Sequence, residues 1–151
     1  MKFEILPAFV TYGWNGIIYK YPDTNMGGNW RSTNPKAEQD AMRDKNKSSN
    51  GLLFDTCKHM RYIRDNYFKS YHLSGIVIDS FVYAAIKNWR WTTPEESSSA
   101  AEPGEYEKLL YDYYLYNLRF SNTINAPRSN DYVDVSSSKD CLEKVLLKMC
   151  K

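Results

Sequence analysis

The sequence lacks the long apolar run of a membrane-spanning helix, since no stretch approaches about eighteen consecutive apolar residues. Its N-terminal stretch also lacks the apolar region and the small-residue cleavage site of a signal peptide. Cysteine is scarce, and Cys57, Cys141 and Cys150 show no CxxC spacing, which argues against a disulfide framework and against a zinc site. We therefore expect a cytoplasmic protein with reduced thiols.

Excess charge of one sign is also missing, because the formal net charge is only +2. A charge this small gives no support to specific nucleic-acid binding. Apolar residues make up 42% and charged residues 25% of the 151 residues, a composition that excludes a disordered chain and fits one ordinary domain. Tyrosine is abundant, with 13 residues, as in a helical core that opens onto a ligand cleft.

The apolar pattern predicts an α+β fold that is mostly helical, with short N-terminal antiparallel strands followed by a bundle of four to five helices. Residues 1–33 form the strand and loop part, in which residues 3–6 alternate like a strand and Asn15-Gly16 marks a hairpin. Residues 34–151 form the helical domain. Residues 23–35 are polar and rich in glycine, and therefore predict a loop.

Helix start and stop signals divide the helical domain. Asn34 or Thr33 caps a first helix that Asn50-Gly51 ends, and a second helix covers about Leu52 to Asn66. A third, apolar on almost every side, is expected to begin near Ser70 and to lie at the centre. Further predicted elements are a surface loop over 92–105, a tyrosine-rich helix over 106–120, an irregular stretch over 122–137 and an amphipathic helix over 138–150.

Three segments appear in one order and spacing: "KFEILPAF", "WNGIIYKYPDTNMGGNWRSTNP" and "CKHMRYIRDNYFKSYHLSGIVIDSFVYAAI". Together they resemble the C-terminal half of bacterial cGAS/DncV-like nucleotidyltransferases, the CD-NTases of anti-phage CBASS systems, and more distantly the oligoadenylate synthetases. The resemblance runs from Lys2 to about Phe120. It implies an enzyme that joins nucleoside triphosphates into cyclic or linear oligonucleotide second messengers, and it makes residues 1–33 the remnant of a nucleotidyltransferase sheet.

Glu4 matches the third catalytic acid of that family, which precedes a stretch like "LPAF". The resemblance implies that Glu4 is a ligand of the two Mg²⁺ ions that bridge the triphosphate and a group placed to accept a proton from the attacking hydroxyl. Many relatives have Asp here, and Glu is one methylene longer. The competing interpretation is a solvated charge on an edge strand, and we expect Glu4 to face Arg61 if it belongs to the site.

Basic and polar residues supply the nucleotide-binding candidates. The resemblance implies that Arg61 contacts the phosphates and that Lys58, three residues earlier on the same helix face, supports it. Ser70 and Tyr71 are implied at a helix start that favours an anion, and Tyr19 or Tyr21 is a candidate to stack on a base. The alternative for Lys58 and Arg61 is an ordinary solvent-exposed basic surface of a helix. The alternative for Ser70 is a helix cap without a ligand, and for the tyrosines it is packing in the core.

The Gly-Ser element and the Asp-x-Asp pair of the family are missing from the sequence. We therefore expect no nucleotidyl transfer by this chain alone. Mg²⁺ is expected to bind only when a complementary N-terminal half is present. This holds whether the chain is a truncated frame, a fragment or half of a split enzyme. Asp79 lies in the apolar helix and is expected to pair with a basic side chain or a backbone group rather than a metal. The alternative function is a small helical protein-interaction module with no nucleotide site.

Overall fold

A computed structural model describes residues 8–14, 16–22, 30–128 and 131–151 of the chain. At its N-terminal end lies an antiparallel sheet with the order β1-β2-β3. Its strands are β1 (Phe9–Gly13), β2 (Gly16–Pro22) and β3 (Trp30–Thr33). The predicted hairpin is confirmed, since Gly13 pairs with Gly16 where the chain reverses.

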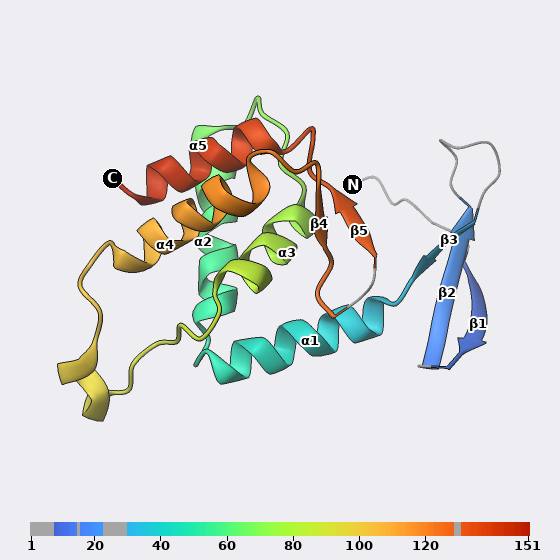
Figure 1. The fold of residues 1–151 in the computed structure, drawn as a ribbon, viewed down its shortest axis with the longest axis horizontal. Helices are drawn as coiled ribbons and strands as arrows, with labels where there is room; N and C mark the ends of the chain where they lie inside the picture. Colours follow the sequence, from blue (N-terminus) through green and yellow to red (C-terminus); the bar gives the residue numbers. More distant parts are fainter. Residues whose placement is uncertain (1–7, 15, 23–29, 129–130) are drawn as a thin grey trace.

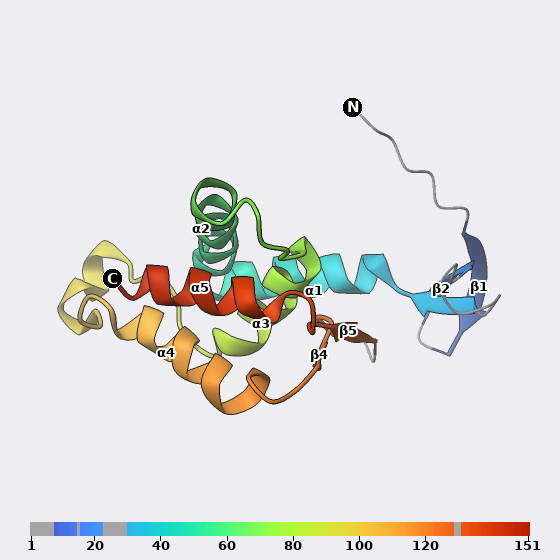
Figure 2. The same cartoon turned by 90° about the horizontal axis from the view of Figure 1, so that it is seen from above.

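Strand β3 lies inside the stretch that was predicted as a loop, and that part of the prediction is wrong. Tyr19 of β2 pairs with Thr33, and Pro22 pairs with Trp30. An edge strand of four residues can form from a polar sequence, because pairing with β2 satisfies its backbone and no apolar face is needed. Figure 1 and Figure 2 show the sheet beyond the N-terminal end of the first helix, away from the other helices.

The remaining chain is mostly helical, which confirms the predicted α+β class with short N-terminal strands. Its α-helices are α1 (Pro35–Ser48), α2 (Leu52–Tyr67), α3 (Gly75–Ala85), α4 (Glu105–Tyr113) and α5 (Lys139–Met149). Asn34 caps α1 as predicted, because its side-chain oxygen accepts a hydrogen bond from the Ala37 amide at 3.1 Å. Gly51, with φ of +90°, makes the sharp turn between α1 and α2.

Helix α3 begins at Gly75, so the predicted start near Ser70 is wrong. Helix α2 continues to Tyr67, and Ser70 lies in the turn that follows, where the Tyr71 amide donates to the Phe68 carbonyl at 2.9 Å. Ser74 is the residue that precedes the first helical turn of α3, and its amide donates to the Ser138 hydroxyl at 3.3 Å. The Ser74 side chain makes no capping hydrogen bond, and the contact with Ser138 instead fixes the backbone at the start of α3.

The C-terminal region holds two strands that the sequence did not predict. Within the stretch expected to be irregular, β4 (Thr123–Asn125) pairs antiparallel with β5 (Tyr132–Asp134). The surface loop before α4 contains a short 3₁₀ helix, η1 (Pro94–Ser99), and the tyrosine-rich helix ends in a π-helical turn, η2 (Tyr114–Leu118). Three-residue strands carry too little alternation to be read from sequence.

Helix α3 is the centre of the core, as its apolar sequence predicted. It contacts α1, α2, α4 and both C-terminal strands, and Figure 1 shows it enclosed by these elements. Its fully buried side chains include Val77, Ile78, Phe81 and Val82. Helix α5 adds its predicted apolar face through Leu142, Val145 and Leu146. Within the described ranges, every helix is too short or too polar to cross a membrane.

Candidate functional site

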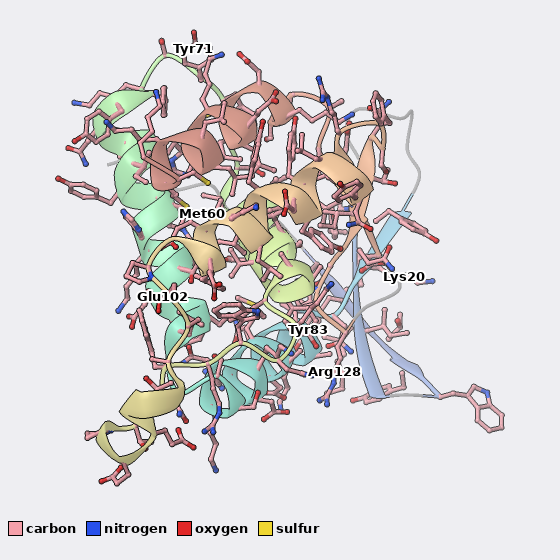
Figure 3. All side chains as sticks on the ribbon, turned by 60° about the vertical axis from the view of Figure 1, so that its left-hand side comes forward. Lys20, Met60, Tyr71, Tyr83, Glu102 and Arg128 are labelled. Carbon is pink, nitrogen blue, oxygen red and sulfur yellow. The ribbon has the colours of Figure 1, made fainter. Side chains whose placement is uncertain are left out.

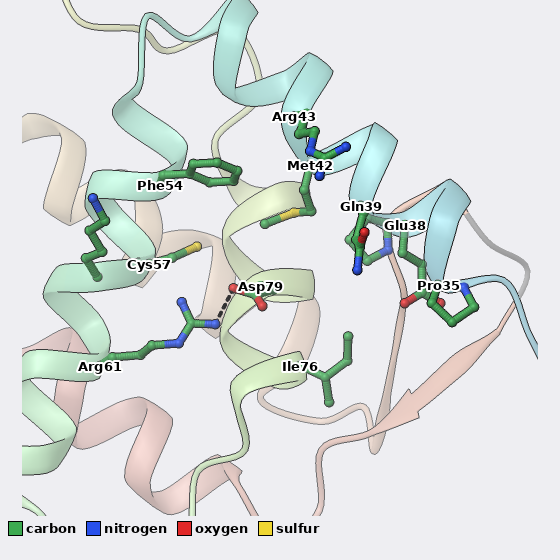
Figure 4. A pocket seen from close by; sticks show the side chains of 12 residues that line it. Pro35, Glu38, Gln39, Met42, Arg43, Phe54, Cys57, Arg61, Ile76 and Asp79 are labelled. Atoms are coloured by element: carbon green, nitrogen blue, oxygen red, sulfur yellow. Dashed lines mark hydrogen bonds and ion pairs between the residues drawn. The ribbon is translucent and has the colours of Figure 1, made fainter. Parts of the chain in front are cut away.

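A cleft of about 390 Å³ opens between α1, α2 and α3. Figure 4 shows the side chains of the three helices converging on it. The cleft is lined by Pro35, Glu38, Gln39, Met42, Arg43, Phe54, Cys57, Lys58, Arg61, Ile76, Asp79 and Pro127. Its size lies within the roughly 300–1,000 Å³ of small-molecule sites, and it combines apolar side chains with charged ones, as such sites do.

Three cationic side chains line this cleft: Arg43 from α1, and Lys58 and Arg61 from α2. Arg43 is loosely paired, with its guanidinium 3.7 Å from the Asp40 carboxylate on a largely exposed surface. Among the described residues, Lys58 forms no salt bridge within 4.0 Å, so its ammonium is open to a ligand. Positive charge beside apolar side chains is the combination that a phosphorylated aromatic ligand needs.

Arg61 is held by a short ion pair across the cleft wall. Its Nη2 atom lies 2.6 Å from Oδ1 of Asp79, and it also approaches the Gly75 carbonyl at 3.4 Å. The two charged side chains are 34% and 29% exposed, so the pair is only partly shielded from water. The expectation that Asp79 pairs with a basic side chain is therefore confirmed, and Figure 4 shows this pair as a link between α2 and α3.

Cys57 lies beside the ion pair and is almost fully buried. Burial first and the nearby Asp79 carboxylate second raise the pKa of its thiol from 9.0 to about 12, against the opposing effect of Arg61. The thiol therefore stays protonated at neutral pH, which makes Cys57 a poor nucleophile or metal ligand. Its contribution to the cleft is apolar contact.

The predicted phosphate-binding residues do not all come together. Lys58 and Arg61 line the same cleft. Tyr71 instead lines a separate hollow of about 260 Å³ at the C-terminal end of α2, where Lys144 lies 4.9 Å above its ring. Ser70 lies in the same turn, exposed to solvent. Figure 3 shows Tyr71 well separated from Arg128, the residue that follows the cleft-lining Pro127.

The two N-terminal candidates lie elsewhere. Tyr19 is half-buried on β2, paired with Val10 and Thr33, and is not among the residues that line the cleft. Glu4 lies outside the described residues, so its expected orientation toward Arg61 remains a prediction. Within the described part of the chain, His, Cys, Asp and Glu side chains nowhere gather in a group of three that could hold a metal ion.

Phe54, Met42 and Arg43 belong to the cleft although they were not predicted as site residues. A signal for Phe54 exists in the sequence, since Phe54, Lys58 and Arg61 follow each other at steps of four and three residues and so share one face of α2. Met42 and Arg43 carried no such signal. Their place in the cleft depends on how α1 packs beside α2 and α3, which is a tertiary contact.

Comparison with protein-family models, with curated proteins and with solved structures finds no significant match to this chain.

Proposed function

We propose that this chain is the C-terminal, substrate-binding part of a nucleotidyltransferase of the CD-NTase type, acting in anti-phage defence. In this proposal the cleft between α1, α2 and α3 binds the phosphates of a nucleoside triphosphate through Lys58 and Arg61. The observation that carries the proposal is that these two residues, selected by the sequence resemblance, line one cleft of suitable size. Because nucleoside triphosphates are cytoplasmic metabolites, the proposal places the protein in the cytoplasm.

The chemistry of the cleft supports a nucleotide in two ways. Lys58 and Arg61 offer charge-assisted hydrogen bonds to phosphate oxygens, and Arg43 adds a third positive charge at the same wall. Met42 and Phe54 provide apolar surface against which a base can pack. A triphosphate must compete with Asp79 for Arg61, so Lys58 is expected to make the first contact.

Magnesium enters the proposal only together with residues from another chain. Nucleotidyl transfer needs clustered carboxylates for its metal ions, and the described residues contain no such cluster. Asp79, a carboxylate that lines the same cleft, already binds Arg61 at 2.6 Å. Glu4 is the proposed contribution of this chain, and a complementary N-terminal half is the proposed source of the missing ligands.

The N-terminal sheet supports such a partner. The Phe9 side chain is 64% exposed and that of Val10 is 51% exposed. Successive residues of a strand point to opposite faces of the sheet. Apolar side chains are therefore exposed on both faces of the sheet. A small sheet is marginally stable until it is covered or extended. A complementary half that packs against the faces of this sheet would bury these side chains.

Calorimetric titration with ATP tests the proposal. ATP is expected to bind, and Lys58→Gln is expected to weaken its binding about tenfold to a hundredfold, because a hydrogen bond to a charged group contributes about 1.5–3 kcal/mol. Lys108→Gln is the matched control: Lys108 is also an exposed helical lysine but does not line the cleft, and its replacement should leave ATP binding unchanged. Equal losses in both variants, or no ATP binding by the wild type, would contradict the proposal.

The same protein incubated with Mg²⁺ and labelled nucleoside triphosphates is expected to form no oligonucleotide product. Product formation would show that the missing ligands are not needed. The alternative function, a helical interaction module, draws support from Tyr116 and Phe120, which are 86% and 89% exposed at the end of the tyrosine-rich helix. Failure of ATP binding together with capture of a partner through these two residues would favour that alternative.

A further inference from the structure

A second hollow lies away from the proposed nucleotide cleft, between the start of α2, the segment after α3 and the start of α4. Its volume is about 250 Å³. It is lined by Leu52, Trp89, Arg90, Trp91, Thr92, Ala100, Ala101, Glu102, Pro103, Gly104, Tyr106 and Glu107. This volume lies below the roughly 300–1,000 Å³ of sites for drug-sized ligands, so the hollow suits a small molecule or a single side chain.

The aromatic rings of this hollow are held in place by named contacts. Trp89 and Tyr106 pack on each other with ring centres 5.5 Å apart, and the Tyr106 hydroxyl shares a hydrogen bond of 2.8 Å with the Thr56 hydroxyl. The Trp91 indole donates to the Asp55 carboxylate at 2.9 Å. Ligand-independent contacts thus fix all three rings, which lowers the entropic cost of binding a ligand in the hollow beside them.

Backbone hydrogen bonds fix the same segment. The Trp91 amide donates to the Ser49 carbonyl at 3.1 Å, and the Asn50 side chain donates to the Trp91 carbonyl at 2.7 Å. The aromatic segment is thereby attached to the turn between α1 and α2. The hollow is therefore part of the folded body rather than a gap beneath a loose loop.

The charge of the hollow is negative. Glu102 and Glu107 line it, and neither forms a salt bridge within the described residues. Figure 3 shows Glu102 on the segment that leads into α4. Arg90, the one cationic side chain among the described residues that line it, is bound to Glu96 at 2.5 Å. The N-terminus of α4 contributes only about half a positive charge, which the two carboxylates exceed.

We propose that this hollow binds an organic ammonium cation with a trimethylammonium headgroup. Aromatic faces attract a cation through their quadrupoles, and a methylated ammonium gives up its hydration more readily than a primary one. The neighbouring carboxylates add an attraction that a neutral ligand of the same shape does not feel. The headgroup can come from a free quaternary amine such as choline or from a trimethylated lysine of a protein partner.

An NMR titration of the wild-type chain tests this site, with the Trp89 and Trp91 indole N–H signals as the readout. Choline is expected to shift these signals with at least tenfold higher affinity than 3,3-dimethylbutan-1-ol, its uncharged isostere. Glu107→Gln is expected to weaken choline binding about threefold to tenfold. Glu105→Gln, which removes the same charge from a neighbouring residue that does not line the hollow, should leave it unchanged.

A peptide with one trimethyl-lysine forms the second arm of the experiment. Tighter binding of the peptide than of choline assigns the site to a protein partner, and the reverse order assigns it to a free amine. Equal binding of choline and the neutral isostere, or no shift of either indole signal with choline and peptide, would overturn the proposal. Because none of these readouts involves ATP, the result is independent of the proposed nucleotide cleft.

Discussion

Replacing Asp79 by asparagine separates the two roles of Arg61, because it keeps the shape of residue 79 and removes its charge. In the wild type, Asp79 holds the Arg61 guanidinium at 2.6 Å, with both side chains about one third exposed. Fully exposed ion pairs contribute about 0–1 kcal/mol, whereas breaking a buried pair costs about 3–5 kcal/mol. For this half-shielded pair we expect Asp79→Asn to lower the free energy of unfolding by about 1–2 kcal/mol.

The same substitution is expected to strengthen ATP binding. A phosphate bound by Arg61 lies close to the Asp79 carboxylate, and two such charges about 6 Å apart repel each other by roughly 1–3 kcal/mol at an effective dielectric constant of about 20–80. Removing that repulsion, and the competition for Arg61, corresponds to roughly a fivefold or larger gain in affinity. Stability and affinity should therefore change in opposite directions.

Urea unfolding and ATP titration of the same preparation measure both effects. Asp65→Asn is the matched control, because Asp65 also pairs with an arginine of α2 but does not line the cleft. We expect it to leave ATP binding unchanged. Weaker ATP binding by the Asp79→Asn variant would refute the reasoning, since it would mean that Asp79 orients Arg61 for the phosphate instead of competing with it.

Two further predictions concern buried polar groups of the helical core. Because burial raises the pKa of Cys57 above its unfolded value of 9.0, the stability that the protonated thiol contributes is complete below about pH 9 and is lost as the pH rises toward 12. Between pH 8 and about pH 10.5, the free energy of unfolding measured with urea should therefore fall by about 2 kcal/mol more for the wild type than for the non-titrating variant Cys57→Ala. Parallel plots of unfolding free energy against pH for the two proteins would contradict this. The Ser80 hydroxyl is buried and has no hydrogen-bond partner among the described residues, so Ser80→Ala should raise the melting temperature by roughly 2–4 °C, whereas a lower value would reveal an unseen partner.

Local signals were enough to predict much of the fold. The helix cap at Asn34, the turn at Gly51 and the hairpin at Gly13 and Gly16 each depend on a few neighbouring residues, and the structure has all three. Strands β3, β4 and β5 were missed because their stability comes from the partner strand and not from their own short sequences. The start of α3 was misplaced for a related reason, since the contact between Ser74 and Ser138 joins residues far apart in the chain.

The candidate site divides in the same way. Lys58 and Arg61 share one helix face, so their common cleft follows from helical spacing. The side chains that complete the cleft, such as Met42 and Ile76, come from α1 and α3 and are set by tertiary packing. Tyr71 is separated from this cleft because α2 continues to Tyr67, so that the turn containing Tyr71 lies at the C-terminal end of the helix.

The central claim, that the cleft between α1, α2 and α3 binds a nucleoside triphosphate, is tested most directly by locating bound ATP. An NMR titration of the isotope-labelled chain reports every backbone amide and the Arg61 side-chain N–H signals at once. The claim predicts that saturable shifts concentrate at the cleft-lining residues of the three helices and at Arg61. Shifts concentrated instead around Tyr71 and His72, or on the N-terminal sheet, or no saturable shifts at all, would contradict it.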